Sequence, residues 1–159
     1  MSGRRLSERQ QRRIRSIQER RRQRLAARVD EALSHADPQG PQEGRVITRH
    51  GSNLVVQDRR DELIHCLFRQ NLGHLVCGDR VVWQPTGSGE GVVTAVLDRR
   101  SVLARPDYSG REKPLAANIT QLAVVLAPNP EPSEYLIDQY LVACETIGVD
   151  GLIVINKID

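Results

Sequence analysis

The chain has 159 residues, of which 39% are hydrophobic and only 3% are aromatic. This composition fits one or two small globular domains with a core of Val, Leu, Ile and Ala, and it excludes a wholly disordered protein. No stretch approaches the roughly 18 apolar residues of a membrane span, and the polar, Arg-rich beginning lacks the apolar segment of a signal peptide. We therefore expect a soluble, cytoplasmic protein that does not bind membranes. The three cysteines, none of them in a C-x-x-C pair, predict neither a disulfide framework nor a complete metal site.

The net charge of +3 is unevenly distributed along the chain. Residues 1–36 hold 11 arginines against 4 acids, a balance of +7, whereas residues 37–159 hold 12 basic and 16 acidic residues, a balance of −4. A basic block of this kind is typical of an interaction tail, and a polyanion is its natural partner. Two alternatives stay open: a solvated tail that only aids solubility, and a mitochondrial presequence, against which Glu8 and Glu19 count modestly.

The basic arm and its linker, residues 1–43, are predicted to be mobile when free or helical on RNA. The abundance of Ala, Leu, Arg, Gln and Glu favours a helix over Glu8–Leu33, but the sparse apolar residues could bury little surface on their own. Two prolines and a glycine in His35–Glu43 prevent the helix from continuing.

Residues 44–100 contain five short apolar segments separated by turn residues, which predicts a small closed β barrel. Five is the strand number of the OB-fold, a frequent nucleic-acid-binding barrel, although an SH3-like barrel would give nearly the same pattern. The predicted strands are Arg45–Arg49, Asn53–Gln57, Leu63–Phe68, Arg80–Gln84 and Gly91–Leu97.

After a connector over residues 101–117, residues 118–159 have the pattern of an α/β domain. Gln121–Leu126 is a continuous apolar strand of the kind that is buried on both faces, and Leu152–Ile155 is another. Between them, apolar residues recur on one helical face, from an N-cap at Ser133 to a left-handed end at Gly148. This order predicts a βαβ unit with parallel strands.

The second of these strands runs directly into Asn156-Lys157-Ile158-Asp159, the N-K-x-D pattern that reads guanine in GTPases. Ligands of open α/β sheets bind beyond the carboxyl ends of the strands, where this tetrapeptide would lie. Guanine presents two adjacent donors, its ring N–H and its exocyclic amine, and the carboxylate of Asp159 can accept from both. Asn156 would add an amide contact, and the stem of Lys157 would lie along the base. The alternative is that Asn156 and Asp159 only form a turn after a strand.

A phosphate-cradling loop of the form G-x-x-x-x-G-K-[ST] is absent upstream of this motif. Residues 87–91 are glycine-rich, but no Lys-Ser or Lys-Thr follows them, so we interpret them as a hairpin loop. In an ordinary GTPase the phosphate loop precedes the guanine motif. Here, either the motif is a chance match or the domain is circularly permuted.

Six short segments form an ordered set that is specific, although no single one of them is. They are Leu6–Arg13 (LSERQQRR), Gly78–Trp83 (GDRVVW), Ser101–Asp107 (SVLARPD), Ala116–Leu122 (AANITQL), Tyr140–Thr146 (YLVACET) and Asn156–Asp159 (NKID). Over nearly the whole chain, this set resembles the ribosome small subunit-dependent GTPase A (RsgA/YjeQ) family of circularly permuted bacterial GTPases.

The resemblance implies an OB-fold followed by the first βαβ unit of a permuted P-loop GTPase domain. It also implies docking on the 16S rRNA of the small ribosomal subunit, a role in late maturation of that subunit, and hydrolysis of GTP with Mg²⁺. A C-terminal zinc-binding domain, the phosphate loop and the magnesium-binding motifs would all lie beyond Asp159. We therefore expect this chain alone to be inactive, with no catalytic or metal-binding residue of its own.

Arginine is suited to RNA because its planar fork pairs with phosphate oxygens. Since the barrel offers only Phe68 and Trp83 for base stacking, and strand alternation favours a core position for them, we expect recognition of backbone and shape. The histidines are assigned no catalytic role, and we expect a monomer. Two other functions stay open, a free-standing OB-fold RNA-binding module with an incidental NKID and an interaction domain without an RNA role. The candidate RNA contacts are Arg4, Arg5, Arg12, Arg13, Arg45, Arg49, Arg59, Arg60, Arg69 and Arg80.

Overall fold

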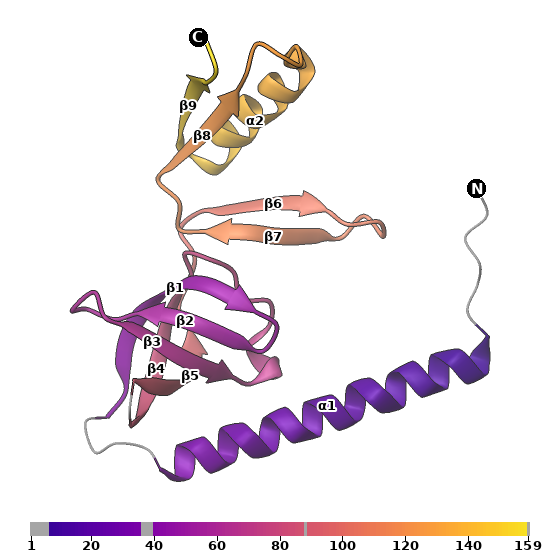
Figure 1. The fold of residues 1–159 in the computed structure, drawn as a ribbon, viewed down its shortest axis with the longest axis vertical. Coiled ribbons are helices and arrows are strands. Elements are labelled where there is room, and N and C mark those ends of the chain that lie inside the picture. Colours follow the sequence, from indigo (N-terminus) through magenta and orange to yellow (C-terminus); the bar gives the residue numbers. More distant parts are fainter. Residues whose placement is uncertain (1–6, 36–39, 88, 159) are drawn as a thin grey trace.

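A computed structural model of the chain describes residues 7–35, 40–87 and 89–158. In chain order these form a long helix, a five-stranded barrel, a two-stranded hairpin and a strand–helix–strand unit. Figure 1 shows the helix lying across one end of the molecule, the barrel beside it, and the hairpin between the barrel and the last unit.

The barrel is closed, with the strand order β1-β2-β3-β5-β4. All of its strand pairs are antiparallel except β3 with β5, which is parallel. This five-stranded Greek-key closure is that of the OB-fold, so the predicted OB-fold is confirmed and the SH3-like alternative is not. The strands are β1 (Gln42–His50), β2 (Asn53–Gln57), β3 (Leu63–Phe68), β4 (Arg80–Gly87) and β5 (Glu90–Val96).

Alternation along the strands supplies the barrel core, because every second side chain points inward. Trp83 lies at its centre, and its ring fills the space above Gly44 and Gly91. A Cβ at Gly91 would lie 2.6 Å from Cε3 of Trp83. Burial raises the pKa of the Cys66 thiol to about 12, which keeps it neutral. The buried cluster comprises Val46, Leu54, Val56, Ile64, Cys66, Phe68, Leu75, Val81, Trp83 and Val93, so Phe68 and Trp83 are core residues.

Helix α1 (Glu8–Ser34) begins with a capping box, in which Ser7 and Gln10 bond each other's backbone amides. Only Leu25 and Val29 of α1 are buried, against Val92 of β5. We expected the arm to be mobile when free or helical on RNA. In the structure the arm forms a helix on the barrel, and these two apolar side chains cover an apolar spot of the barrel wall.

The segment predicted as a plain connector forms a hairpin of β6 (Val102–Pro106) and β7 (Glu112–Ala117). The prediction missed the turn chemistry of its tip. The carboxylate of Asp107 accepts hydrogen bonds from the amides of Ser109 at 2.8 Å and Arg111 at 3.0 Å, and Gly110 takes a left-handed conformation with φ +75°. An Asx-type turn of this kind closes a hairpin between two strands.

The last unit consists of β8 (Gln121–Leu126), α2 (Glu134–Ile147) and β9 (Asp150–Ile155), and β8 pairs with β9 in parallel as predicted. Gly148 ends α2 in the left-handed conformation, but the hydroxyl of Ser133 makes no capping bond. The predicted burial of both strands is wrong. All of β9 is exposed, and Val124 is the buried residue of β8. Among the described residues, the two strands pair only with each other, so the sheet has no neighbouring strands to enclose it.

The barrel and the hairpin meet at a close backbone contact. Gly78 lies between η1 (Gln70–Leu72) and β4 with φ +88°, and a Cβ there would lie 1.8 Å from the carbonyl oxygen of Ala117. Ala117 is fully buried, and its amide donates to the carbonyl of Cys77 at 3.0 Å. The Asn118 side chain donates to the carbonyl of Gly78 at 2.9 Å. Two of the six segments that carry the family resemblance, GDRVVW and AANITQL, are therefore in direct contact.

Replacement of Gly78 by Ala is expected to destabilise the barrel by about 2 to 4 kcal/mol, since the methyl group adds a backbone clash to a left-handed conformation. The control is Gly51→Ala, at φ +62° with nothing within 4 Å, which should cost only about 1 to 2 kcal/mol. Urea unfolding followed by the fluorescence of Trp83, the single tryptophan, measures both. Equal losses in the two variants would contradict the contact.

Candidate functional site

Helix α1 is the most basic element of the described chain. Its 27 residues include nine arginines against four acids, a balance of +5, and residues 7–24 are exposed on every side of the helix. Arg9, Arg13, Arg20 and Arg24 are spaced so that they share one face. Arg12 lies 4.0 Å from Glu8 in a fully solvated pair, and Arg13 has no acidic partner among the described residues. Arg4 and Arg5 lie outside the described residues.

Three of the predicted barrel arginines share one surface hollow of about 310 Å³. Arg59 and Arg80 both approach the carboxylate of Glu43, at 3.3 Å and 3.7 Å, and Arg45 lies beside them. Asp58 and Asp61 line the same hollow, so its formal charge is zero. These arginines are brought together, but largely by acids of the barrel itself.

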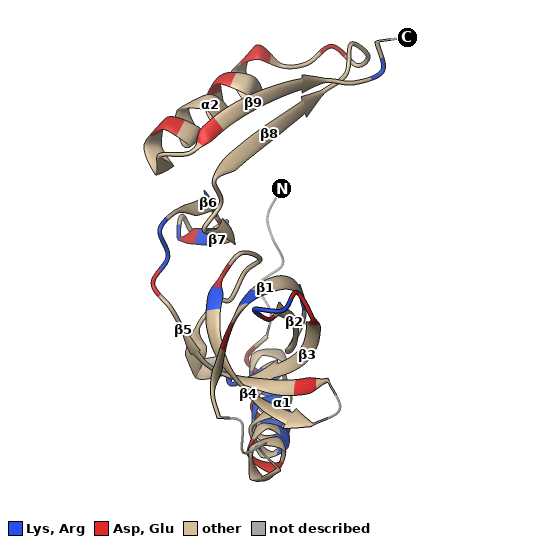
Figure 2. Cartoon of the chain, turned by 90° about the vertical axis from the view of Figure 1, so that its left-hand side faces the viewer, with Lys and Arg blue, Asp and Glu red and all other residues tan. Residues whose placement is uncertain are grey.

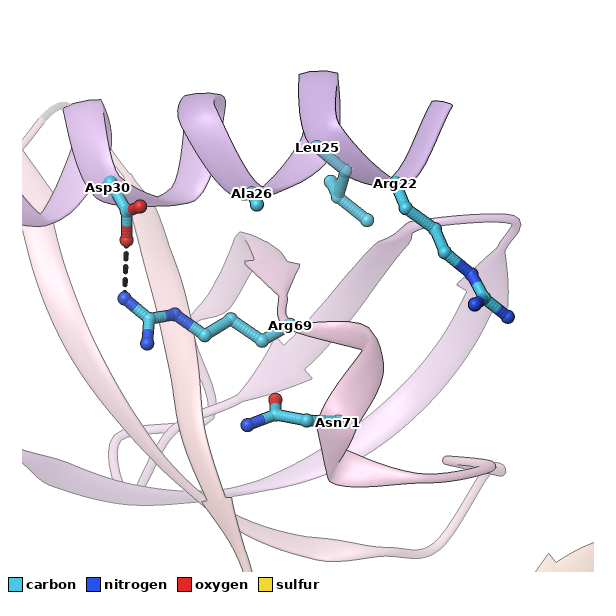
Figure 3. Close-up of a pocket in the computed structure, with 6 residues that line it drawn as sticks. All are labelled: Arg22, Leu25, Ala26, Asp30, Arg69 and Asn71. Carbon is cyan, nitrogen blue, oxygen red and sulfur yellow. Dashed lines mark hydrogen bonds and ion pairs between the residues drawn. The ribbon is translucent and has the colours of Figure 1, made fainter. Parts of the chain in front are cut away.

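Two further arginines that were predicted to contact RNA make contacts within the protein. Arg49 lies 5.3 Å from the centroid of the Phe68 ring and donates to the carbonyl of Leu75 at 2.6 Å and to Nδ1 of His74 at 3.2 Å. Arg69 forms an ion pair with Asp30 of α1, shown in Figure 3, which ties the helix to the barrel. Arg60 lines a separate hollow beside Trp83. The six barrel arginines therefore do not form one continuous basic surface.

Sequence reasoning missed a buried ion pair behind the loop between β3 and β4. Asp79 is completely buried, and its carboxylate accepts from Arg99 at 2.7 Å and 2.8 Å and from the amide of Val76 at 2.8 Å. The hydrogen bond to Asp79 raises the pKa of Arg99. The aspartate in GDRVVW was visible as part of a segment, but nothing in the sequence indicated that Arg99, twenty residues later, is its partner.

The guanine-reading motif lies at the carboxyl end of β9. The amide of Asn156 donates to the carbonyl of Leu126 at 2.8 Å, which places the motif beside the end of β8 as well. Lys157 is left-handed, with φ +55°, and its amide donates to Oδ1 of Asn156 at 2.9 Å. Ile158 is exposed, and Asp159 lies outside the described residues. The motif therefore begins where a ligand of an α/β sheet binds.

Other chemistry is not evident in the described part of the chain. Gly87, the last residue of β4, and Gly89, just before β5, both have positive φ at the β4–β5 hairpin turn, as predicted for a hairpin. No group of three His, Cys, Asp or Glu side chains is placed to hold a metal ion within the described ranges. Neither α1 nor α2 has the length and apolar character of a bilayer span.

The comparisons with known proteins agree on one family. The family model described as RsgA GTPase matches residues 96–159. A Pseudomonas aeruginosa protein named Small ribosomal subunit biogenesis GTPase RsgA is 43% identical over 162 residues, covering 100% of this chain and 48% of the relative. The protein of the same name from Sodalis glossinidius is 46% identical over 168 residues, covering 100% and 47%. The chain thus spans about half the length of the curated relatives it matches.

Solved structures give the same result. YjeQ from Thermotoga maritima matches with a TM-score of 0.59 and 34% identity, over 76% of this chain and 42% of its own. YloQ, described as a circularly permuted GTPase, matches with a TM-score of 0.58 and 28% identity over the same shares. These neighbours agree with an OB-fold followed by part of a permuted GTPase domain.

The loss of folding stability at acid pH is expected to depend on His74. Partial burial and then the cations Arg49, Lys113 and Arg99 lower its pKa, while Asp79 opposes them. The unfolded chain therefore binds a proton more readily, and stability that is full above about pH 6.5 falls as the pH drops below it. His74→Gln should show a smaller loss of urea midpoint between about pH 7.5 and pH 5.5 than the parent chain or His35→Gln. An unchanged loss would contradict this assignment.

Proposed function

Because this chain belongs to the RsgA family of circularly permuted GTPases, we propose that it is the rRNA-docking half of a GTPase that acts in late maturation of the small (30S) ribosomal subunit. In this proposal α1 and the OB barrel bind 16S rRNA, and the end of β9 contributes the guanine-specificity motif. The parent protein hydrolyses GTP, acts in the cytoplasm as a monomer and does not bind membranes.

The observation that carries the docking function is the charge of α1. Residues 7–24 of α1 are exposed on every side and include most of its nine arginines, and no acid outside the helix pairs with those arginines among the described residues. Figure 2 shows Lys and Arg residues on α1 and on the barrel, and mainly acidic residues among the coloured positions of α2 and its strands. A cationic helix can lie along phosphates without reading sequence, which fits backbone and shape recognition of a folded RNA.

The barrel contributes position more than charge. Its exposed arginines near β1 and β4 are partly neutralised by Glu43, so they would make weaker phosphate contacts than those of α1. Arg69 sets the direction of α1 through Asp30, and Leu25 and Val29 fix the helix on β5. In this proposal the barrel therefore fixes the position from which α1 contacts the rRNA.

Guanine recognition is proposed for Asn156, Lys157, Ile158 and Asp159. The placement of Asn156 at the carboxyl ends of β8 and β9 supports it, since both strands deliver their ends to one edge. The parent protein would hydrolyse GTP with Mg²⁺ as the cofactor. No residue of this chain is assigned to the phosphates, to Mg²⁺ or to Zn²⁺, so the chain alone is expected to be inactive. A zinc-binding region would belong to the other half of the relatives' length.

Neutralising α1 is expected to weaken docking. Arg13 and Arg20, both replaced by Gln, should reduce the slope of log affinity against log salt by about 1 to 2, because two phosphate contacts are lost. Co-sedimentation with purified small ribosomal subunits over a salt series measures it. The matched control, Arg59 and Arg80 replaced by Gln, removes the same charge from cations that already face Glu43 and should change the slope less. Equal binding by all three chains would overturn the role of α1.

Replacement of Asp159 by Asn in a protein that also carries the other half is expected to lower GTP affinity roughly a hundredfold or more, since the paired acceptor for guanine is lost. The amide can donate to the extra carbonyl of xanthine, so affinity for xanthosine triphosphate should rise. Nucleotide titration measures both affinities. Binding to small subunits should persist, and its loss together with guanine selectivity would contradict the division into a docking part and a nucleotide-binding part.

A further inference from the structure

The tip of the β6–β7 hairpin presents a fully exposed aromatic ring. Tyr108 makes no packing contact that covers its ring, whereas Phe68 and Trp83 are sealed in the barrel core. An exposed tyrosine is a flat apolar surface with a polar edge, which is the kind of group that stacks against another planar system. Figure 1 shows the hairpin projecting sideways from the body of the molecule, so its tip is open to a partner.

Hydrogen bonds within the turn order the backbone that carries Tyr108. Asp107 accepts from the Ser109 hydroxyl at 2.6 Å and from the amides of Arg111 and Ser109, and these bonds lower its pKa. At its other end the hairpin is fixed to the barrel through the buried Ala117 and its bond to Cys77. The backbone of the hairpin would therefore need little further ordering when a partner binds.

Two cations face each other on the same hairpin. Arg105 lies directly opposite Lys113 in the antiparallel register, and opposed residues share one face of a two-stranded ribbon. Both are exposed, and within the described ranges neither forms an ion pair. Like charges directly opposite each other destabilise a hairpin. An anion placed between them would remove that repulsion.

The ring and the two cations line one hollow. Arg105, Pro106, Asp107, Tyr108 and Lys113 surround a space of about 280 Å³ at the hairpin tip. Asp107 is the acidic member, and its Oδ1 is occupied by the turn. The hollow thus combines a stacking surface with paired positive charge, a combination that matches a nucleobase and the phosphates on either side of it.

We propose that the hairpin tip binds one unpaired nucleotide of single-stranded RNA, with Tyr108 stacked on the base and Arg105 and Lys113 on the flanking phosphates. This inference rests on the proposed function for the choice of RNA. This binding differs from that proposed for α1, which contacts phosphates and can do so on a duplex. A base within a duplex has both faces covered and cannot stack on Tyr108. An unpaired base has a free face, and its stacking is tolerant of sequence.

The test compares the whole chain with three variants by fluorescence anisotropy. The probe is a 5′-fluorescein-labelled single-stranded oligoadenylate of about ten nucleotides. Tyr108→Ala should weaken its binding about 5- to 30-fold, and Tyr108→Phe, which keeps the ring, should stay within about twofold. Tyr135→Ala is the matched control, because this tyrosine is also well exposed but lies in the first turn of α2 and not on the hairpin. It should bind as the parent chain does.

Two further probes separate the alternatives. Tyr108→Ala should leave binding to a self-complementary RNA duplex unchanged, and an equal loss on both RNAs would overturn stacking on an unpaired base. Polyglutamate of similar charge should compete weakly, and competition as strong as that of the oligoadenylate would overturn RNA as the ligand in favour of an acidic peptide. Equal oligoadenylate binding by Tyr108→Ala and the parent chain would also overturn the proposal.

The outcomes also distinguish this site from the proposed function. Small subunits that bind the parent chain and Tyr108→Ala equally, together with a loss of oligoadenylate binding only in the variant, support both. Oligoadenylate binding that depends on Tyr108, without any binding to small subunits, supports the hairpin site and overturns the proposed docking. Binding to neither RNA overturns both.

Discussion

The arrangement of this chain depends on the contact between Gly78 and the carbonyl of Ala117. No side chain fits between the two backbones, so the barrel and the base of the hairpin are joined main chain to main chain. Asn118 closes the contact by donating to Gly78, and Asp79, the next residue in the barrel, is buried and paired with Arg99. The joint fixes the base of the β6–β7 hairpin on the barrel.

The arginines of α1 and those of the barrel are placed differently. The arginines of α1 face solvent, whereas several barrel arginines are occupied by carbonyls, by the Phe68 ring or by acids of the same chain. The buried carboxylate of Asp79 is paired with the partly buried Arg99 and hydrogen-bonded to the Val76 amide, as a buried charge must be to be tolerated. Counting arginines in a sequence therefore overstates the basic surface of the barrel.

The strand–helix–strand unit is a different case, in which local pattern and burial disagree. The sequence of β9 is as apolar as that of an enclosed strand, yet Ile153 and Ile155 are exposed. β8 and α2 are its described neighbours, and two strands with one helix cannot cover both faces of a sheet. A pattern of apolar residues reports what a strand is suited to pack against. Which neighbours are present decides whether it is buried.

The sequence by itself determined the strands of the barrel, the two helices, the parallel pairing of β8 with β9 and the position of Asn156 after β9, because periodicity, turn residues and caps act over a few neighbouring residues. Only the tertiary structure decided that α1 rests on β5 through Leu25 and Val29, that Arg99 pairs with Asp79, and that the connector is a hairpin with Tyr108 at its tip. These features depend on contacts between residues distant in the chain, or on turn bonds that look the same in sequence as an irregular loop. A local sequence pattern does not determine which distant residue a side chain contacts.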